Sequence, residues 1–264
     1  DGVTVRRPVP LKPGSQDSCG RCEAAVNYLF IQNMAIQWDQ ISRSSYIRRI
    51  EALRSLDALH FTKPVTFFVG ENGSGKSTLL EAIAVAAGFN PEGGTRNYVF
   101  STFDSHSELC GAIRLTKGFH RPRWGYFLRA ESFYNVATKE MDYTDLDHPS
   151  ARLHEKSHGE SFLAIAQENF QGDGIYLLDE PEAALSPQRQ LTLLAEIYQC
   201  ASEGAQFIIA THSPILLGMP DAEILSFDCG KVHPCRYEDT DSYQVTEMFI
   251  NHRRSMLKGL LSEE

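Results

Sequence analysis

The sequence has a shortage of basic residues and no long apolar run. It contains 25 Lys and Arg against 34 Asp and Glu, which gives a formal net charge of −9. Because contacts to nucleic-acid phosphates require clustered cations, this balance argues against general nucleic-acid binding. No stretch approaches the roughly 20 apolar residues of a membrane-spanning helix. The first 18 residues also lack the apolar core of a signal peptide. We therefore expect a cytoplasmic protein.

Paired cysteines are also scarce. Cys19 and Cys22 form the one CxxC pair of the chain. A structural zinc site is tetrahedral and would need two further ligands. Cys229, His233 and Cys235 could supply them only if the fold brings these distant segments together. The alternative, which we favour, is that the cysteines are reduced thiols of a cytosolic protein.

Continuous apolar runs dominate what the sequence does have. The segments "VTFFV", "GIYLLDE", "QFIIAT" and "EILSF" predict buried strands, and segments with helical periodicity alternate with them. This alternation is typical of an α/β domain with a mainly parallel core sheet. With 264 residues, of which 42% are hydrophobic, the chain is long enough for one large core. We expect a flexible arm over residues 1–25 and a single domain over 26–264, with a helical insert at about 130–172.

The remaining elements are predicted from shorter patterns. Residues 46–61 are ambiguous between helix and strand, and 245–261 suit a helical region whose polar middle could hold a break. Residues 25–36 and 96–102 read as strands. Alternation in 109–118 and 124–131 predicts the two arms of a β-hairpin, joined by "FHRPR".

Basic and aromatic residues are interleaved at the tip of that predicted hairpin. They are Lys117, His120, Arg121, Arg123 and Trp124. Such a pattern can bind single-stranded nucleic acid. It also fits an ordinary solvated turn, and the overall acidity of the chain favours that alternative.

A glycine-rich segment, "GENGSGKST", lies between the predicted strand 65–69 and a predicted helix from Lys76 to about Ala87. It matches G-x-x-x-x-G-K-[ST] in the strand–loop–helix context of a P-loop. Glycines let successive N–H groups point inward at an anion, and the helix N-terminus adds its positive end. Lys76 would reach the β- and γ-phosphates. The predicted nucleotide-binding residues are Gly70, Glu71, Asn72, Gly73, Ser74, Gly75, Lys76, Ser77 and Thr78.

Two acidic residues follow the apolar run "IYLL". Asp179 would hold Mg²⁺ together with the Ser77 hydroxyl, directly or through water. Glu180 would face the γ-phosphate and polarise the attacking water. The predicted cofactors are therefore ATP and Mg²⁺.

Four motifs in order carry a family resemblance: "GENGSGKST", "SHGES", "LLDEPEAALSP" and "IIATHSP". They resemble the ATP-binding-cassette (ABC) ATPases over about residues 26–228. The sequences of these motifs most resemble those of the soluble members related to chromosome-maintenance and RecF proteins, and those of short stand-alone bacterial AAA family ATPases. The resemblance implies a P-loop NTPase head with a mainly parallel core sheet, a β-subdomain hairpin and a small helical subdomain.

The resemblance also implies roles for particular residues. Ser157, Gly159 and Glu160 match the signature motif, which in the family binds the γ-phosphate held by the other subunit. His212 matches the switch histidine, which with Lys76 and Glu180 would complete the catalytic set. These matches imply a head-to-tail homodimer that closes around two ATP molecules.

The sequence departs from the family pattern at two places. No Gln occurs between Lys76 and Ser157, and Ser101 stands where the family has its Q-loop glutamine, which makes Ser101 a candidate metal ligand. Ser186 stands where the D-loop normally carries Asp. Both departures bear on communication across the dimer more than on ATP binding.

Three functions are therefore open. The first is a Mg²⁺-dependent ATPase with an unknown protein partner, in a DNA-related or defence process. The second is the nucleotide-binding subunit of a membrane transporter, against which the missing glutamine argues. The third is an ATP-gated binding switch with little turnover. The segment between Lys76 and Ser157 lacks heptads, which excludes long coiled-coil arms.

Overall fold

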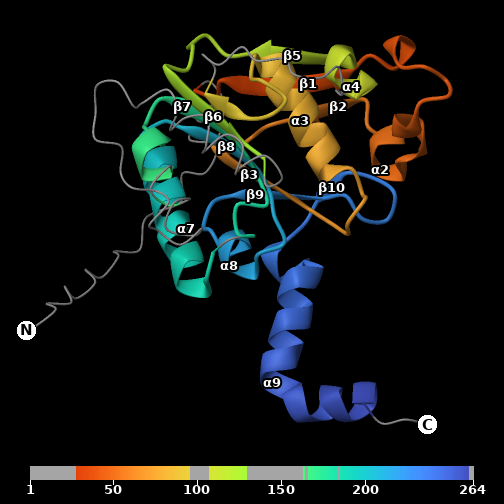
Figure 1. Ribbon diagram of the computed structural model, residues 1–264, viewed down its shortest axis with the longest axis vertical. Helices are drawn as coiled ribbons and strands as arrows, with labels where there is room; N and C mark the ends of the chain where they lie inside the picture. The colour runs from red at the N-terminus through yellow and green to blue at the C-terminus, as the bar shows by residue number, and fades with distance from the viewer. Residues whose placement is uncertain (1–27, 96–106, 130–162, 164–165, 184, 262–264) are drawn as a thin grey trace, which may run out of the picture.

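The computed structural model describes residues 28–95, 107–129, 163, 166–183 and 185–261. Its centre is a seven-stranded sheet in the order β10-β9-β3-β8-β7-β6-β4 (Figure 1). The five inner strands are mutually parallel: β3 (Val65–Val69), β6 (Trp124–Leu128), β7 (Gly174–Asp179), β8 (Gln206–Ala210) and β9 (Glu223–Ser226). The short edge strands β4 (Gly94–Thr95) and β10 (His233–Pro234) are antiparallel. The predicted α/β class with a mainly parallel core sheet is confirmed.

Helices cover both faces of this sheet, which explains why its strands are apolar at every position. Phe68, Leu177 and Ile208 pack in one core with α3 (Lys76–Ala87). Their strand neighbours Phe67, Leu178 and Ile209 pack on the opposite face with α7 (Pro187–Ser202) and α8 (Pro214–Leu217). Figure 1 shows α3 and α7 on opposite sides of the strands.

A second, three-stranded antiparallel sheet packs over α3. Its order is β2 (Ala58–His60), β1 (Ile31–Ile36), β5 (Ile113–Lys117). The helical turns η1 (Trp38–Gln40), η2 (Tyr46–Arg49) and α2 (Glu51–Arg54) lie between β1 and β2, and α4 (Glu108–Ala112) precedes β5. The ambiguous segment 46–61 is thus helical first and a strand at its end. The strand predicted at 25–36 begins at Ile31.

The predicted hairpin is wrong. β5 pairs with β1 in the small sheet, whereas β6 pairs with β7 and β4 in the large one. Residues 108–112 are helical, and Tyr126, Phe127 and Leu128 are consecutively buried, as an inner strand of a covered sheet requires. The segment 118–123 therefore links two sheets and is not a hairpin tip. Its Arg123 Nε lies 3.3 Å from Asp173 Oδ2.

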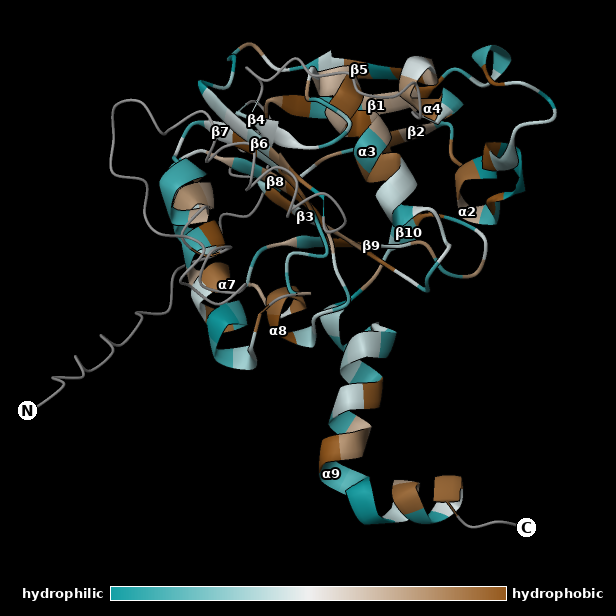
Figure 2. Ribbon diagram, in the orientation of Figure 1, coloured by the Kyte–Doolittle hydropathy of each residue, from teal (hydrophilic) through white to brown (hydrophobic). Residues whose placement is uncertain are grey.

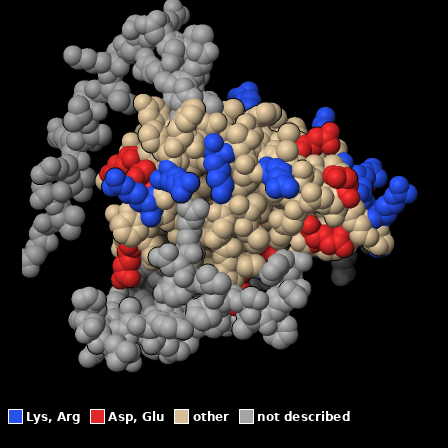
Figure 3. All heavy atoms as spheres, turned by 90° about the horizontal axis from the view of Figure 1, so that it is seen from above, with Lys and Arg blue, Asp and Glu red and all other residues tan. Residues whose placement is uncertain are grey.

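Cationic side chains gather over the small sheet. Figure 3 looks down on this side and shows Lys and Arg in a row, with acidic side chains towards its two ends. Arg114 and Lys117 of β5 are exposed. Local charge here is thus more positive than the net charge of the chain suggests. For Lys117 and its neighbours up to Trp124, nucleic-acid binding stays the less favoured of the two alternatives drawn from the sequence.

Helix α9 (Asp241–Leu261) follows the turn η4 (Tyr237–Asp239) and projects away from the rest of the molecule (Figure 1). Its backbone leaves helical geometry at His252, with φ −124° and ψ 28°, which confirms the predicted break. Within the described parts of the chain, no helix is both long and apolar enough to cross a membrane.

Other predictions fall outside the described residues. They concern the arm over 1–25, the strand at 96–102 and most of the insert at 130–172. From that insert, Ala166 and Phe170 are described, and both are buried in the core on the α7 side of the large sheet. The division into arm and single domain stays a prediction.

Candidate functional site

The glycine-rich loop runs from the end of β3 to the start of α3. Gly70, Gly73 and Gly75 all have positive φ, at 139°, 83° and 101°. At Gly70 a Cβ would lie 2.9 Å from Asp228 Oδ1, and at Gly75 it would lie 2.8 Å from Ile50 Cγ2. Glycine is therefore required at these two positions by both conformation and space. The loop has the curled backbone that the P-loop motif predicts.

Lys76 is the first residue of α3, and it is buried. Its Nζ donates to the carbonyl oxygens of Gly70 at 2.6 Å and Glu71 at 2.9 Å. Burial lowers the pKa of Lys76, while nearby carboxylates, Glu180 first and Asp228 next, act in the opposite direction. An ammonium group carries three N–H donors, so one remains for an anion above the loop.

Ser77 and Asp179 lie together, although 102 positions separate them in the chain. Ser77 Oγ donates to Asp179 Oδ1 at 2.9 Å. Asp179 ends the buried strand β7 and is 8% exposed, and its burial raises its pKa to about 6. A carboxylate beside a hydroxyl is the hard oxygen donor set that Mg²⁺ prefers. The structure thus brings the two predicted metal ligands together.

Glu180 and His212 lie beside this pair, at the ends of adjacent strands. Glu180 has φ 47°, an uncommon conformation for a residue other than glycine, and its N–H donates to the Ala210 carbonyl oxygen at 2.9 Å. His212 Nε2 lies 4.0 Å from Glu180 Oε1, and the two side chains are 38% and 41% exposed. With Glu71 and Asn72 they line a hollow over the P-loop. The predicted catalytic residues Lys76, Glu180 and His212 therefore share one end of the sheet.

Unpartnered polar atoms mark this site as built for a ligand. Among the described residues, four buried side-chain N or O atoms have no hydrogen-bond partner. Three of them are Ser74 Oγ in the P-loop, Glu182 Oε2 and His212 Nε2. Buried polar groups are normally satisfied, so such a concentration needs an explanation. A phosphate oxygen would accept from Ser74 Oγ and from an Nε2–H tautomer of His212, and a water molecule would donate to Glu182 Oε2.

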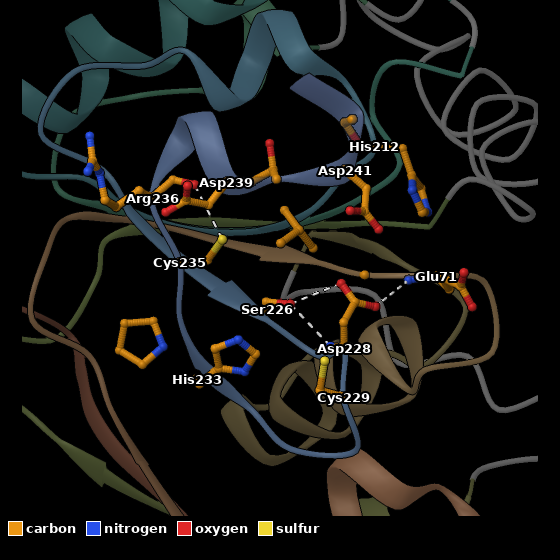
Figure 4. A pocket seen from close by; sticks show the side chains of 15 residues that line it. Glu71, His212, Ser226, Asp228, Cys229, His233, Cys235, Arg236, Asp239 and Asp241 are labelled. Atoms are coloured by element: carbon orange, nitrogen blue, oxygen red, sulfur yellow. Dashed lines mark hydrogen bonds between the residues drawn. The ribbon is translucent and has the colours of Figure 1, made fainter. Parts of the chain in front are cut away.

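Asp228 belongs to the site but was not predicted from the sequence. Its Oδ1 accepts the N–H of Glu71 at 3.0 Å, and its Oδ2 accepts the Ser226 hydroxyl at 3.0 Å (Figure 4). It thereby ties the P-loop to the end of β9. In the sequence it is a single Asp after an apolar strand, and nothing in that pattern marks it.

Glu182 was missed as well. Its Oε1 accepts the His212 N–H at 2.6 Å, and so it fixes the backbone that carries the histidine. It is the third acidic residue of the motif "DEPEAA", whereas the pattern after the apolar run points to the first two, Asp179 and Glu180. The acceptor role becomes visible only when β7 and β8 are placed side by side.

Several predicted residues lie outside the described part of the chain. They are Cys19, Cys22, Ser101, Ser157, Gly159 and Glu160, and their roles stay predictions. Cys229, His233 and Cys235 line one hollow beside the P-loop (Figure 4). The described residues contain no group of three or more His, Cys, Asp or Glu arranged to hold a metal ion. These three residues therefore do not form a zinc site by themselves.

Comparison with known proteins finds two family models that match parts of the chain. A model described as "AAA domain" matches residues 46–145, and one described as "AAA domain, putative AbiEii toxin, Type IV TA system" matches residues 152–218. The first segment contains the P-loop, and the second contains Asp179, Glu180 and His212. The chain is thus similar to AAA and ABC-type ATPases over the segments that form the site.

Two curated relatives are ATP-binding proteins of import systems. The hemin import ATP-binding protein HmuV of Aliivibrio fischeri is 24% identical over 186 residues, which span 64% of this chain and 72% of the relative. The phosphate import ATP-binding protein PstB 1 of Streptococcus mutans is 26% identical over 170 residues, which span 54% and 68%. Hemin import and phosphate import are named here as functions of these relatives.

Among solved structures, similar chains come from ABC transporters. The ADP conformation of MJ1267, from an ABC transporter, gives a TM-score of 0.43 at 16% identity and covers 89% of this chain and 99% of that one. The cbiO1 structure from Clostridium perfringens, part of the cbiONQ transporter complex, gives 0.42 at 15% identity and covers 86% and 97%.

Proposed function

We propose that the chain binds ATP with Mg²⁺ and hydrolyses it to ADP and phosphate. This proposal rests on the hydrogen bond from Ser77 to Asp179, which lies beside the glycine-rich loop and the buried ammonium group of Lys76. Ser77 and Asp179 would hold the metal ion, which when bound neutralises phosphate charge. The P-loop N–H groups and Lys76 bind and orient the phosphates.

Glu180 is the proposed catalytic base. Glu180 directly follows the proposed metal ligand Asp179, and the side-chain contact described for it is to His212 Nε2 at 4.0 Å, which leaves its carboxylate able to accept a proton from water. His212 lies beside it and would contact the γ-phosphate through Nε2, which is unpartnered here. Glu182 holds the His212 backbone in place.

A second copy of the chain would complete the site. The side chains of Glu180 and His212 are half-buried and line a hollow that is open on one side of the P-loop. In our proposal Ser157, Gly159 and Glu160 of the other chain cover it, because they match the signature motif that binds the γ-phosphate across the dimer in the family they resemble. ATP would then hold two chains head to tail. Ser101 would contact the metal ion or its water.

Replacement of Glu180 by Gln tests the catalytic assignment. The amide keeps the shape of the side chain but removes the basic carboxylate, so phosphate release should fall by about a hundredfold or more. ATP affinity, measured by calorimetry with Mg²⁺, should stay near the wild-type value because Lys76, Ser77 and Asp179 are unchanged. Unchanged hydrolysis in Glu180→Gln would refute the role of Glu180.

Two other functions remain candidates. The names of the curated relatives favour a transport subunit. That function predicts co-purification with a membrane-embedded protein and turnover that depends on it, whereas our proposal predicts turnover by the isolated chain. An ATP-gated switch predicts tight binding with little phosphate release. DNA-related and defence processes stay hypotheses from the family resemblance.

A further inference from the structure

Helix α9 exposes apolar side chains along both of its arms. Before the break at His252 these are Val245, Met248, Phe249 and Ile250, which are 60%, 50%, 41% and 71% exposed. After it, Leu260 and Leu261 are 73% and 74% exposed. None of the 21 residues of α9 is buried. Figure 2 shows these brown bands on a helix that stands clear of the core.

Only the start of α9 is anchored to the rest of the molecule by the contacts described. The rings of Tyr237 and Tyr243 lie 4.7 Å apart, and Gln244 Nε2 donates to the Glu238 carbonyl oxygen at 3.2 Å. The two arms, of about 16 Å and about 13 Å, are each too short to be stable helices alone in water. Exposed apolar side chains along both halves of a projecting helix indicate a surface that another protein covers.

The charges of the two arms identify a fitting partner. Asp241 and Glu247 are the charged residues of the first arm, and Arg253, Arg254 and Lys258 are those of the second. The first arm of one copy is thus complementary to the second arm of another. A parallel pairing would place like charges together. An antiparallel pairing about a two-fold axis places opposite charges together twice, as an isologous interface requires.

We propose that α9 mediates self-association. In the absence of nucleotide, it pairs antiparallel with α9 of a second copy of this chain. Val245, Met248 and Phe249 lie at i, i+3 and i+4 and form one face of the first arm. That face packs on Leu260 and its apolar neighbours Met256 and Leu257 in the partner. This pairing needs no ATP, unlike the contact proposed above.

The position of α9 would couple such a pair to the ATP site. Asp241 and Ser242, at its start, line the same hollow as Glu71, Asp228 and His212 (Figure 4). Two chains held by α9 would keep their P-loops at high effective concentration, which favours the second, ATP-held contact.

Sedimentation of the nucleotide-free protein over a dilution series tests the proposal. We expect a monomer–dimer equilibrium, weakened by at least about tenfold in Phe249→Glu and in Leu260→Glu, since each puts a charge into the apolar seam. Leu191→Glu is the matched control: it makes the same change at an exposed leucine of α7 and should have no effect. Equal ATP affinity in all three variants will show that the fold is retained.

Charge reversal tests the antiparallel arrangement. Glu247→Arg and Arg254→Glu should each weaken the dimer roughly twofold to fivefold, as expected for exposed ion pairs. The double variant should restore wild-type affinity. Additive weakening in the double variant would refute the antiparallel pairing.

Two results would overturn the proposal. One is a dimer that Phe249→Glu leaves intact. The other is a monomeric wild-type protein without nucleotide, and binding of that monomer to vesicles of anionic phospholipid through α9 would assign the helix to a lipid surface. Lys76→Ala separates this inference from the proposed function: it should lose ATP binding but keep the nucleotide-free dimer.

Discussion

The P-loop and helix α9 are both incomplete surfaces, but their chemistry is opposite. At the P-loop, polar atoms such as Ser74 Oγ and His212 Nε2 are buried without partners. On α9, apolar side chains such as Phe249 and Leu260 are exposed. A buried polar atom without a partner calls for a small polar ligand, and an exposed apolar face calls for protein. One chain thus contains a site that a ligand completes and a surface that a protein partner completes, and mutations should separate the two.

The largest expected effect is at Lys76. Lys76→Ala removes the charge that compensates the phosphates, so ATP binding should be lost in titration calorimetry. Lys117→Ala removes an exposed lysine of β5 and serves as the control, with unchanged affinity expected. If Lys76→Ala binds ATP as the wild type does, the P-loop assignment is wrong.

Asp179 should show a large, pH-dependent effect on stability. Its pKa is raised from 3.8 to about 6, so folding disfavours the charged form. The resulting penalty is absent below about pH 4, grows as the pH rises through 6, and is then constant. Without nucleotide or metal, Asp179→Asn should therefore stabilise the fold above pH 6 by up to about 3 kcal/mol.

Chemical denaturation at pH 4 and pH 8 measures this difference. The Asn side chain keeps an oxygen acceptor for Ser77, so a packing effect alone would give the same difference at both values. Such a pH-independent result would contradict the explanation by burial. In ATP titrations, the same variant should lose most of its dependence on Mg²⁺.

A smaller effect is expected at Asp228. Asp228→Ala leaves the Glu71 N–H without its acceptor, loosens the P-loop and should weaken ATP binding roughly tenfold. Asp228→Asn keeps an acceptor oxygen and should recover most of the affinity. If the Ala variant binds ATP as tightly as the wild type, then Asp228 does not position the loop.

Local patterns were enough to predict one part of the site. The glycine-rich loop, Lys76 and Ser77 are contiguous, and their chemistry follows from spacing between a strand and a helix. Asp179 and Glu180 were found because an apolar run precedes them. Neither required knowledge of which strands are neighbours. The break in α9 was likewise predicted from a polar stretch, and the structure places it at His252.

The rest depends on strand order, which local patterns do not encode. Asp228 reaches the P-loop because β9 lies parallel to β3, with Val69 opposite Ser226. The hairpin prediction failed for the same reason. β5 finds its partner in β1, far earlier in the chain, and β6 finds its partner in β7, far later. Period-two alternation identified both strands but not their neighbours.

Dimerisation of the Glu180→Gln variant in the presence of ATP tests the ATP-held dimer most directly. Phe249→Glu should be added, so that α9 cannot hold two chains together. Light scattering after size exclusion should show a dimer with ATP and Mg²⁺ and a monomer with ADP, since unhydrolysed ATP keeps the γ-phosphate for Ser157 of the second chain. Adding Ser157→Arg should abolish this dimer while ATP stays bound. A double variant that binds ATP and Mg²⁺ yet remains monomeric at high concentration would contradict the account.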